Sequence, residues 1–191
     1  ASTRWFAEPE ALLKAVSTIL PAGIELEYDG SYRAMFCYKA KNYALFDGEK
    51  VTIRGSALRS RGIEPYLKKL SDRLIRFLLG AGAESPVALI DDYRKRIAAR
   101  TADVRELAKS ENLGQSTDAY EKFVAGGGKP RRAAAEAALR LTPRPRMGER
   151  VAYYIVPKLK GGGSSDWQRA RPVELFDPAT APYDPDYYLE K

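Results

Sequence analysis

The sequence predicts an α+β protein, with a helix on an antiparallel β-sheet in its first part and a mostly helical second part that contains a small β element. Three observations support this fold class. Apolar and polar residues alternate before about residue 60, apolar residues recur at helical spacing after Pro65, and the run VAYYIV at 151–156 has the composition of a strand. The period changes between Gly62 and Pro65, which predicts a boundary between residues 1–62 and residues 63–191.

The first part is predicted to contain one helix and four strands. Pro9 can open a helix over 9–20, whose apolar residues share one face. Residues 24–28 alternate apolar side chains with glutamates, as in a half-buried strand. Asp-Gly pairs supply two turn signals in this part of the chain. The other three strands are expected at 32–38, 42–46 and 50–54.

The second part is predicted to be helical, with one strand. The strand is expected at 150–158, around the apolar run, and residues 160–172 are expected to form a flexible basic loop. Residues 176–191 show too little apolar periodicity for any prediction. Helices are expected at 65–80, 85–100, 101–109, 117–124 and 130–141.

The composition narrows the classes of function. The chain has 32 Lys and Arg against 25 Asp and Glu, a net charge of +7 and a pI near 9.4, which favours a polyanionic partner such as nucleic acid. It contains no histidine, so histidine-based triads and zinc sites are excluded. Cys37 is the only cysteine and, like Tyr38 and Phe46, is expected in the core. Neither a membrane span nor a signal peptide is recognisable, so we expect a cytoplasmic protein with no membrane partner.

Two basic clusters are candidates for contact with nucleic acid. The first lies on the hairpin of residues 38–62, where six basic residues face only Asp47 and Glu49. The second follows a run of three glycines, whose backbone could approach a phosphate. It does not match a P-loop, because Phe123 and Pro130 stand where that motif needs glycine and a hydroxyl residue. The alternative for either cluster is a solvated surface. The clusters are Lys39, Lys41, Lys50, Arg54, Arg59 and Arg61, and then Lys129, Arg131 and Arg132.

No catalytic or metal-binding residue is predicted. The neighbouring carboxylates Asp91 and Asp92 diverge on a helix, and Glu25 and Glu27 share one face of a predicted strand. Neither pair has further ligands at a recognisable spacing, so both are expected to be surface charges.

Three segments resemble family B DNA polymerases. Residues 23–67, from GIELEYDG to IEPYL, resemble the end of the palm domain and the start of the thumb domain, particularly in the bacterial polymerase II-like branch. Residues 148–158 and 170–191 resemble the closing segments of the thumb. The resemblance covers nearly the whole chain and is weakest between about 81 and 125. Its most specific element is Lys41-Asn42-Tyr43, which matches the Lys-x-Tyr motif of the family.

The resemblance implies roles for individual residues. Lys41 would approach the minor-groove edge of the duplex near the primer terminus, and Tyr43 would contact the strand backbone. Arg59 and Arg61 match basic residues that lie against the primer strand where the palm meets the thumb. Residues 1–62 would then be a palm remnant and residues 63–191 a thumb. Further contacts with DNA are expected from Lys39, Arg54, Lys129, Arg131 and Arg132.

The resemblance also implies what this chain lacks. In the family, two aspartates from upstream palm motifs bind the metal ions of nucleotidyl transfer, and residues 1–6 contain no aspartate. We therefore expect no cofactor in this chain, and Mg²⁺ and nucleotide binding only in a complete polymerase. The chain would be either a portion of a longer polymerase or a stand-alone protein that kept the duplex-holding part.

The function expected from the sequence is a sequence-independent grip on primer-template duplex DNA, in support of replication or repair synthesis catalysed elsewhere. Other polymerase domains or subunits are expected as partners. Two alternatives remain open. The chain could be a subunit of an active split polymerase, a nucleotidyltransferase whose aspartates come from another chain. It could also be an interaction module whose basic surface binds an acidic protein or RNA.

Overall fold

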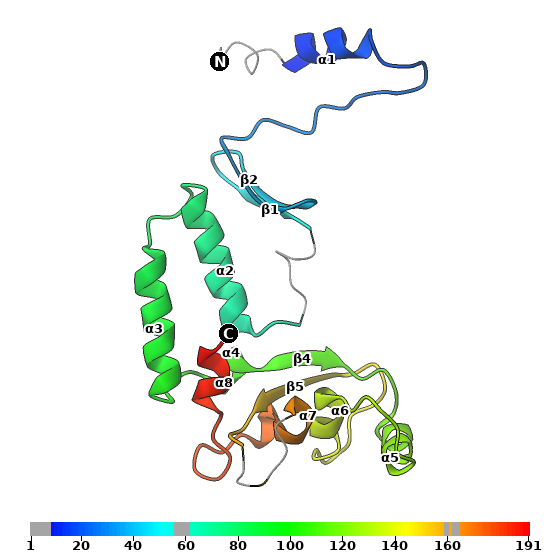
Figure 1. Cartoon of the computed structure of the whole chain (residues 1–191), viewed down its shortest axis with the longest axis vertical. Helices are drawn as coiled ribbons and strands as arrows, with labels where there is room; N and C mark the ends of the chain where they lie inside the picture. The colour runs from blue at the N-terminus through cyan, green and yellow to red at the C-terminus, as the bar shows by residue number, and fades with distance from the viewer. Residues whose placement is uncertain (1–8, 56–61, 159–160, 162–164) are drawn as a thin grey trace.

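The computed structural model describes residues 9–55, 62–158, 161 and 165–191. It confirms the predicted α+β class, with two three-stranded antiparallel sheets that are connected by the long helices α2 and α3 (Figure 1). The helices are α1 Pro9–Ser17, α2 Pro65–Leu78, α3 Pro86–Ala98, α4 Val104–Leu107, α5 Thr117–Ala125, α6 Ala133–Ala138, α7 Asp166–Arg169, η2 Val173–Leu175 and α8 Pro185–Leu189. The strands are β1 Ala34–Lys39, β2 Asn42–Phe46, β3 Val51–Arg54, β4 Lys109–Asn112, β5 Arg150–Ile155 and β6 Ala170–Pro172.

The upper sheet consists of β1, β2 and β3, with β2 in the centre. Ala44 pairs with Phe36 on one side and with Ile53 on the other, so these three side chains share one face. That face packs on α2 through Ile75 and Leu79 and makes a small core. On the other face, Met35 and Leu45 border a hollow of about 660 Å³ that α1 closes from the opposite side.

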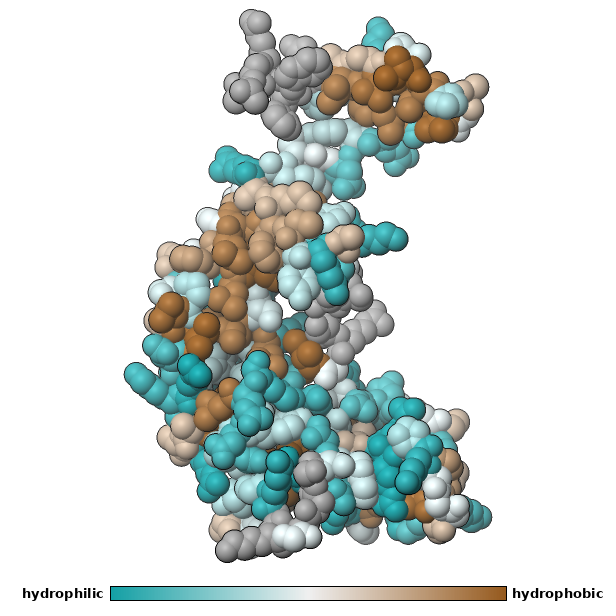
Figure 2. Space-filling model, viewed as in Figure 1, coloured by the Kyte–Doolittle hydropathy of each residue, from teal (hydrophilic) through white to brown (hydrophobic). Residues whose placement is uncertain are grey.

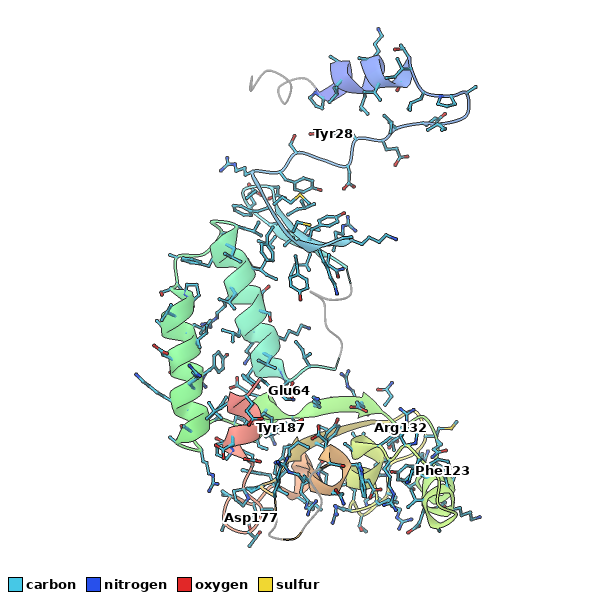
Figure 3. All side chains as sticks on the ribbon, in the orientation of Figure 1. Tyr28, Glu64, Phe123, Arg132, Asp177 and Tyr187 are labelled. Carbon is cyan, nitrogen blue, oxygen red and sulfur yellow. The ribbon has the colours of Figure 1, made fainter. Side chains whose placement is uncertain are left out.

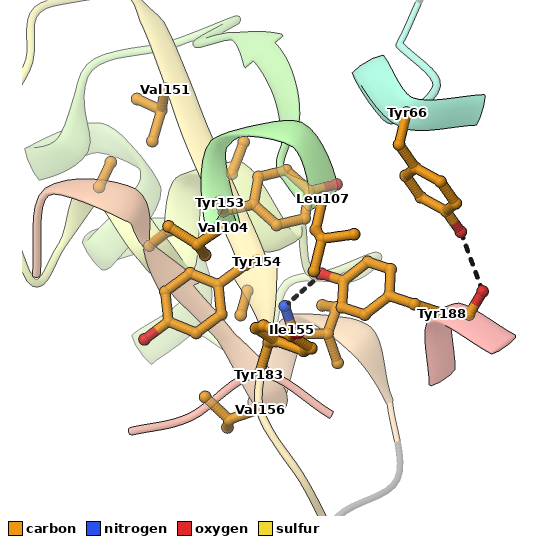
Figure 4. Close-up of a cluster of buried hydrophobic side chains, with 14 of the residues drawn as sticks. Tyr66, Val104, Leu107, Val151, Tyr153, Tyr154, Ile155, Val156, Tyr183 and Tyr188 are labelled. Atoms are coloured by element: carbon orange, nitrogen blue, oxygen red, sulfur yellow. Dashed lines mark hydrogen bonds between the residues drawn. The ribbon is translucent and has the colours of Figure 1, made fainter. Parts of the chain in front are cut away.

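The lower body consists of the sheet β4-β5-β6, α6, α8 and the ends of α2 and α3. Its core is rich in buried tyrosines (Figure 4). The Tyr66 hydroxyl on α2 donates to the Tyr188 carbonyl on α8 at 2.9 Å, and the Ile155 amide on β5 donates to the Tyr188 hydroxyl at 2.9 Å. Tyr188 therefore joins the lower sheet to the start of α2.

Helix α2 belongs to both cores. Its first turns contribute Tyr66 and Leu67 to the lower core, and its last turns contribute Ile75 and Leu79 to the upper one. The helix therefore holds the two sheets in a fixed relation. The division of the chain at residue 62 stays a prediction.

Several predicted elements are present at nearly the expected positions. They are the strands β1, β2, β3 and β5 and the helices α2, α3 and α5. The predicted helices at 9–20 and 130–141 are present but shorter, as α1 and α6. Among the residues that the structure describes, no helix is long and apolar enough to cross a membrane.

Three predictions of secondary structure are wrong. Residues 24–28 form no strand, since no neighbouring strand in the described part of the chain pairs with them. Within 101–109 only α4 is helical, and β4 begins at Lys109 because it pairs with β5. Part of the loop expected at 160–172 forms α7 and then β6, which pairs with the other edge of β5.

Two residues that were expected in the core are exposed. The pairs Cys37 with Tyr43 and Lys39 with Asn42 leave Tyr38 as the extra residue of a β-bulge, and 62% of Tyr38 is exposed. Cys37 is also exposed, because it lies on the sheet face that α2 does not cover.

Candidate nucleic-acid interface

The first candidate site is one end of the upper sheet, which we call the hairpin tip and define as residues 39–43 together with Arg54 and Gly55. Ala40 and Lys41 form the turn between β1 and β2. Lys41 has a φ of 61°, in the left-handed region that a tight hairpin turn requires. Its backbone therefore projects the Lys41 side chain from the extreme end of the sheet.

Two neighbouring residues, Asn42 and Gly55, hold the turn in place. Asn42 is buried, and its side-chain amide donates to the Ala40 carbonyl at 2.9 Å. Gly55 has a φ of 93°, and a Cβ atom there would lie 2.2 Å from the Lys41 carbonyl oxygen. Only glycine allows the end of β3 to approach the turn this closely. The tip is consequently a firm platform for the Lys41 side chain.

The structure brings four of the predicted DNA-binding residues to this tip. Tyr43 pairs with Arg54, and Lys39 pairs with Asn42 one position further along the hairpin. Lys39, Lys41 and Arg54 are exposed, and within the described ranges none of them forms an ion pair. Three positive charges therefore lie at the same end of the sheet as the half-buried Tyr43. Arg59 and Arg61 lie outside the described residues.

The hairpin tip lies on the concave side of the molecule. Figure 2 shows that the outline is hollowed between the upper sheet and the lower body. The upper sheet, labelled by β1 and β2, lies above this hollow (Figure 1). A rod-shaped polyanion could therefore lie beside the tip and contact the lower body as well.

The second candidate site is the loop between α5 and α6. Other side chains of the protein hold Arg131 there, whereas Lys129 and Arg132 form no ion pair within the described ranges. The Arg131 guanidinium lies 3.1 Å from Glu136 Oε1 and 4.6 Å from the centre of the Trp167 ring. These contacts make Arg131 a link between α6 and α7. Lys129 and Arg132 are exposed and have no ion pair with any residue that the structure describes.

Other basic residues near this loop are also held within the protein. Arg144 lies 2.9 Å from Glu121 and 3.3 Å from Asp118, and the Arg150 side chain donates to the Ser110 hydroxyl at 2.8 Å. The two carboxylates offset the charge of Arg144, whereas Arg150 keeps its charge because its partner is a neutral hydroxyl. Because Arg131 and Arg144 are paired with carboxylates, the count of basic residues overstates the positive charge that a ligand would meet.

Sequence reasoning missed the residues that support the tip. Asn42 was noted only as the middle of a motif, and Gly55 was not singled out. A glycine directly after a short strand is the one signal that could have drawn attention to Gly55, since it often marks a close approach of two backbones.

The described residues do not fit a metal ion. Among them, no group of three or more Cys, Asp or Glu side chains could hold one. Asp92 forms an ion pair with Arg96 at 3.0 Å, and Glu25 and Glu27 are exposed.

Comparisons with known proteins find similarity to DNA polymerases. The sequence model of DNA polymerase family B matches residues 4–191. A DNA polymerase of Thermococcus kodakarensis is 30% identical over 180 residues, which are 93% of this chain and 10% of that protein. A DNA polymerase of Desulfurococcus sp. (strain Tok) is 31% identical over 180 residues, which are 93% of this chain and 22% of that protein.

A solved structure shares the fold. The structure of the family B DNA polymerase from the hyperthermophilic archaeon Pyrobaculum calidifontis has a TM-score of 0.67 at 24% sequence identity. The match covers 97% of this chain and 23% of that chain. The chain therefore spans less than a quarter of the length of these relatives.

Proposed function

Because the chain belongs to DNA polymerase family B, we propose that its hairpin tip grips primer-template duplex DNA without reading the base sequence. The observation that carries this proposal is that three exposed cations lie at the same end of the sheet as Tyr43, and none of them forms an ion pair within the described ranges. They are Lys39, Lys41 and Arg54. Phosphate contacts by such residues supply affinity that does not depend on sequence.

The tip supplies the contacts in a fixed geometry. Lys41 projects from the turn and would reach acceptors in the minor groove, which every base pair presents. Tyr43 would lie against the strand backbone, and Arg59 and Arg61 follow the tip closely in the sequence. Lys129 and Arg132 would add phosphate contacts from the lower body, whereas Arg131 would act there by orienting its loop.

The finer assignments are part of the proposal. Residues 1–62 would be the end of a palm domain and residues 63–191 a thumb, of the bacterial polymerase II-like branch. The grip would serve DNA replication or repair in the cytoplasm, next to other polymerase domains or subunits. Nucleotide binding and nucleotidyl transfer with Mg²⁺ would belong to the complete polymerase.

The salt dependence of duplex binding tests the electrostatic part of the proposal. If the chain neutralises about five phosphates, log affinity should fall with log salt concentration with a slope of about −4 to −5. The double variant Lys41→Ala and Arg61→Ala should make the slope shallower by the contribution of about two phosphate contacts. Fluorescence anisotropy at salt concentrations from about 50 to about 300 mM measures this slope. An unchanged slope would place the binding surface elsewhere.

An exposed apolar surface favours a second candidate, a subunit of a split polymerase. Helix α1 has no buried residue. Ile19, Ile24 and Met35 are 79%, 54% and 60% exposed, and the hollow between α1 and the sheet is lined largely by apolar side chains (Figure 2). Such a surface is typical of a face that another polypeptide covers.

A primer-extension assay with the chain alone tests the premise that both candidates share, namely that the chain lacks its own catalytic aspartates. The grip proposal expects no nucleotide incorporation by the chain alone with Mg²⁺, and incorporation by the chain alone would contradict it. Electrophoretic mobility shifts with duplex, single-stranded DNA and RNA test the remaining alternative. Binding to RNA but not to duplex DNA would favour an RNA-interaction module, and binding to none of the three would remove the nucleic-acid proposal.

A further inference from the structure

A pocket of about 340 Å³ lies in the lower body, between the end of β4, helix α5 and the start of α6. The side chains that define it are Asn112, Gln115, Phe123 and Arg132, and Tyr120 closes its base. Figure 3 shows Phe123 and Arg132 close together at the end of the lower body that is far from α8. The volume suits a single nucleotide and is within the ordinary range of small-ligand sites.

The walls of the pocket are fixed by internal hydrogen bonds. The Arg132 backbone amide donates to the Tyr120 hydroxyl at 3.1 Å, and that hydroxyl donates to Glu136 Oε1 at 3.0 Å. Burial raises the pKa of Tyr120, so the hydroxyl keeps its proton at neutral pH. On the opposite wall, the Tyr153 hydroxyl donates to Glu111 Oε1 at 2.6 Å. The pocket is thus formed before any ligand enters.

Three polar side chains of the pocket have no partner. Within the described part of the chain, the amides of Asn112 and Gln115 and the guanidinium of Arg132 form no hydrogen bond or ion pair. An amide offers both donors and acceptors, as the edge of a nucleobase does. A guanidinium is suited to a phosphate, and Lys129 lies three residues before Arg132 on the same loop.

The Phe123 ring is held in place but remains accessible. A Cβ atom at Gly128 would lie 2.4 Å from the ring, so the glycine backbone supports the ring directly. The Tyr120 ring lies 6.5 Å away, between centroids, and 41% of Phe123 is exposed. A fixed, accessible aromatic ring is the element on which unpaired bases stack in single-strand binding sites.

We infer that this pocket binds one unpaired nucleotide of a DNA strand, with the base against Phe123 and its phosphate at Arg132. An unpaired base is the ligand that fits, because the volume of about 340 Å³ suits a single nucleotide and not a base pair. The inference rests on the proposed function only in taking DNA as the ligand. It adds a separate site for single-stranded ends, away from the hairpin tip.

The test is the affinity of the full chain for a fluorescently labelled thymidine pentanucleotide. Phe123→Leu should weaken binding by about five- to 100-fold, the range expected when one stacked base is lost. Phe77→Leu is the matched control, since Phe77 is equally exposed at 41% but lies on α2, outside the pocket. Phe77→Leu should leave the affinity unchanged.

A second pair of variants covers the phosphate contact. Arg132→Gln should weaken pentanucleotide binding by about five- to tenfold at 0.1 M salt, the effect of one lost phosphate contact. Arg94→Gln, an exposed arginine on α3 without an ion pair in the described ranges, should have no effect. Because Arg132 is exposed, its substitution leaves folding intact.

The outcomes separate this site from the duplex grip. Lys41→Ala should weaken duplex binding and leave pentanucleotide binding unchanged, and Phe123→Leu should do the reverse. Equal pentanucleotide affinities for the unsubstituted chain, Phe123→Leu and Arg132→Gln would overturn the inference, whatever the duplex measurements give.

Discussion

The substitution Tyr188→Ala should lower the free energy of unfolding by about 3 to 5 kcal/mol, the usual cost of removing a buried aromatic side chain. Tyr188 is 2% exposed. Its ring contacts those of Tyr66, Tyr183 and Tyr187. Its hydroxyl accepts a hydrogen bond from the Ile155 amide. Alanine would remove the ring contacts and leave the Ile155 amide buried without an acceptor.

Urea unfolding followed by circular dichroism measures this effect. Tyr38→Ala is the control, since Tyr38 is 62% exposed and its loss should cost less than about 0.5 kcal/mol. Tyr188→Phe should fall between the two at about 1 to 3 kcal/mol, because it removes the hydroxyl alone. If Tyr188→Ala cost no more than Tyr38→Ala, α8 would not be part of the lower core.

The substitution Gly55→Ala should disrupt the hairpin tip and with it the affinity for duplex DNA. The new methyl group would lie 2.2 Å from the Lys41 carbonyl oxygen and 2.5 Å from Asn42 Oδ1, both far below van der Waals contact. The turn must then move away from β3. Amide hydrogen exchange should accelerate in β1, β2 and β3 and stay slow in β4 and β5, which lie in the other core.

The control variant Gly80→Ala distinguishes the steric collision expected at Gly55 from the cost of backbone strain alone. Gly80 also has a positive φ, of 70°, but a Cβ atom there would meet nothing within 4 Å. This control should cost about 1 to 2 kcal/mol from the backbone alone and leave duplex binding unchanged. Gly55→Ala with unaltered exchange in the upper sheet would contradict the close contact between β3 and the turn.

The sequence predicts those elements whose signals are local. α2 and α3 follow from helical spacing after prolines, and the hairpin of β2 and β3 follows from alternation around Asp47-Gly48. β4 has the polar sequence KSEN and becomes a strand only through its pairing with β5 about 40 residues later. α1 shows the opposite case, since its apolar face predicts burial but none of its residues is fully buried.

The same difference applies to the candidate sites. Lys39, Lys41 and Arg54 were predicted because charge is visible in a sequence, and their convergence follows from the hairpin register. The engagement of Arg131 by Trp167 and Glu136 was not predictable, because Trp167 lies 36 residues further along the chain. The nucleotide pocket likewise draws its walls from three elements with no shared motif.

The most direct test of the central claim compares two primer-template duplexes of unrelated sequence by fluorescence anisotropy. The chain should bind both with the same affinity, and Lys41→Ala should weaken both by about five- to tenfold at 0.1 M salt. Lys50→Ala is the control, because Lys50 lies at the opposite end of the sheet, where its backbone amide donates to Asp47 and helps to lower the pKa of that carboxyl. It should change neither affinity appreciably. Binding to only one duplex, or equal losses for Lys41→Ala and Lys50→Ala, would contradict a sequence-independent grip at the hairpin tip.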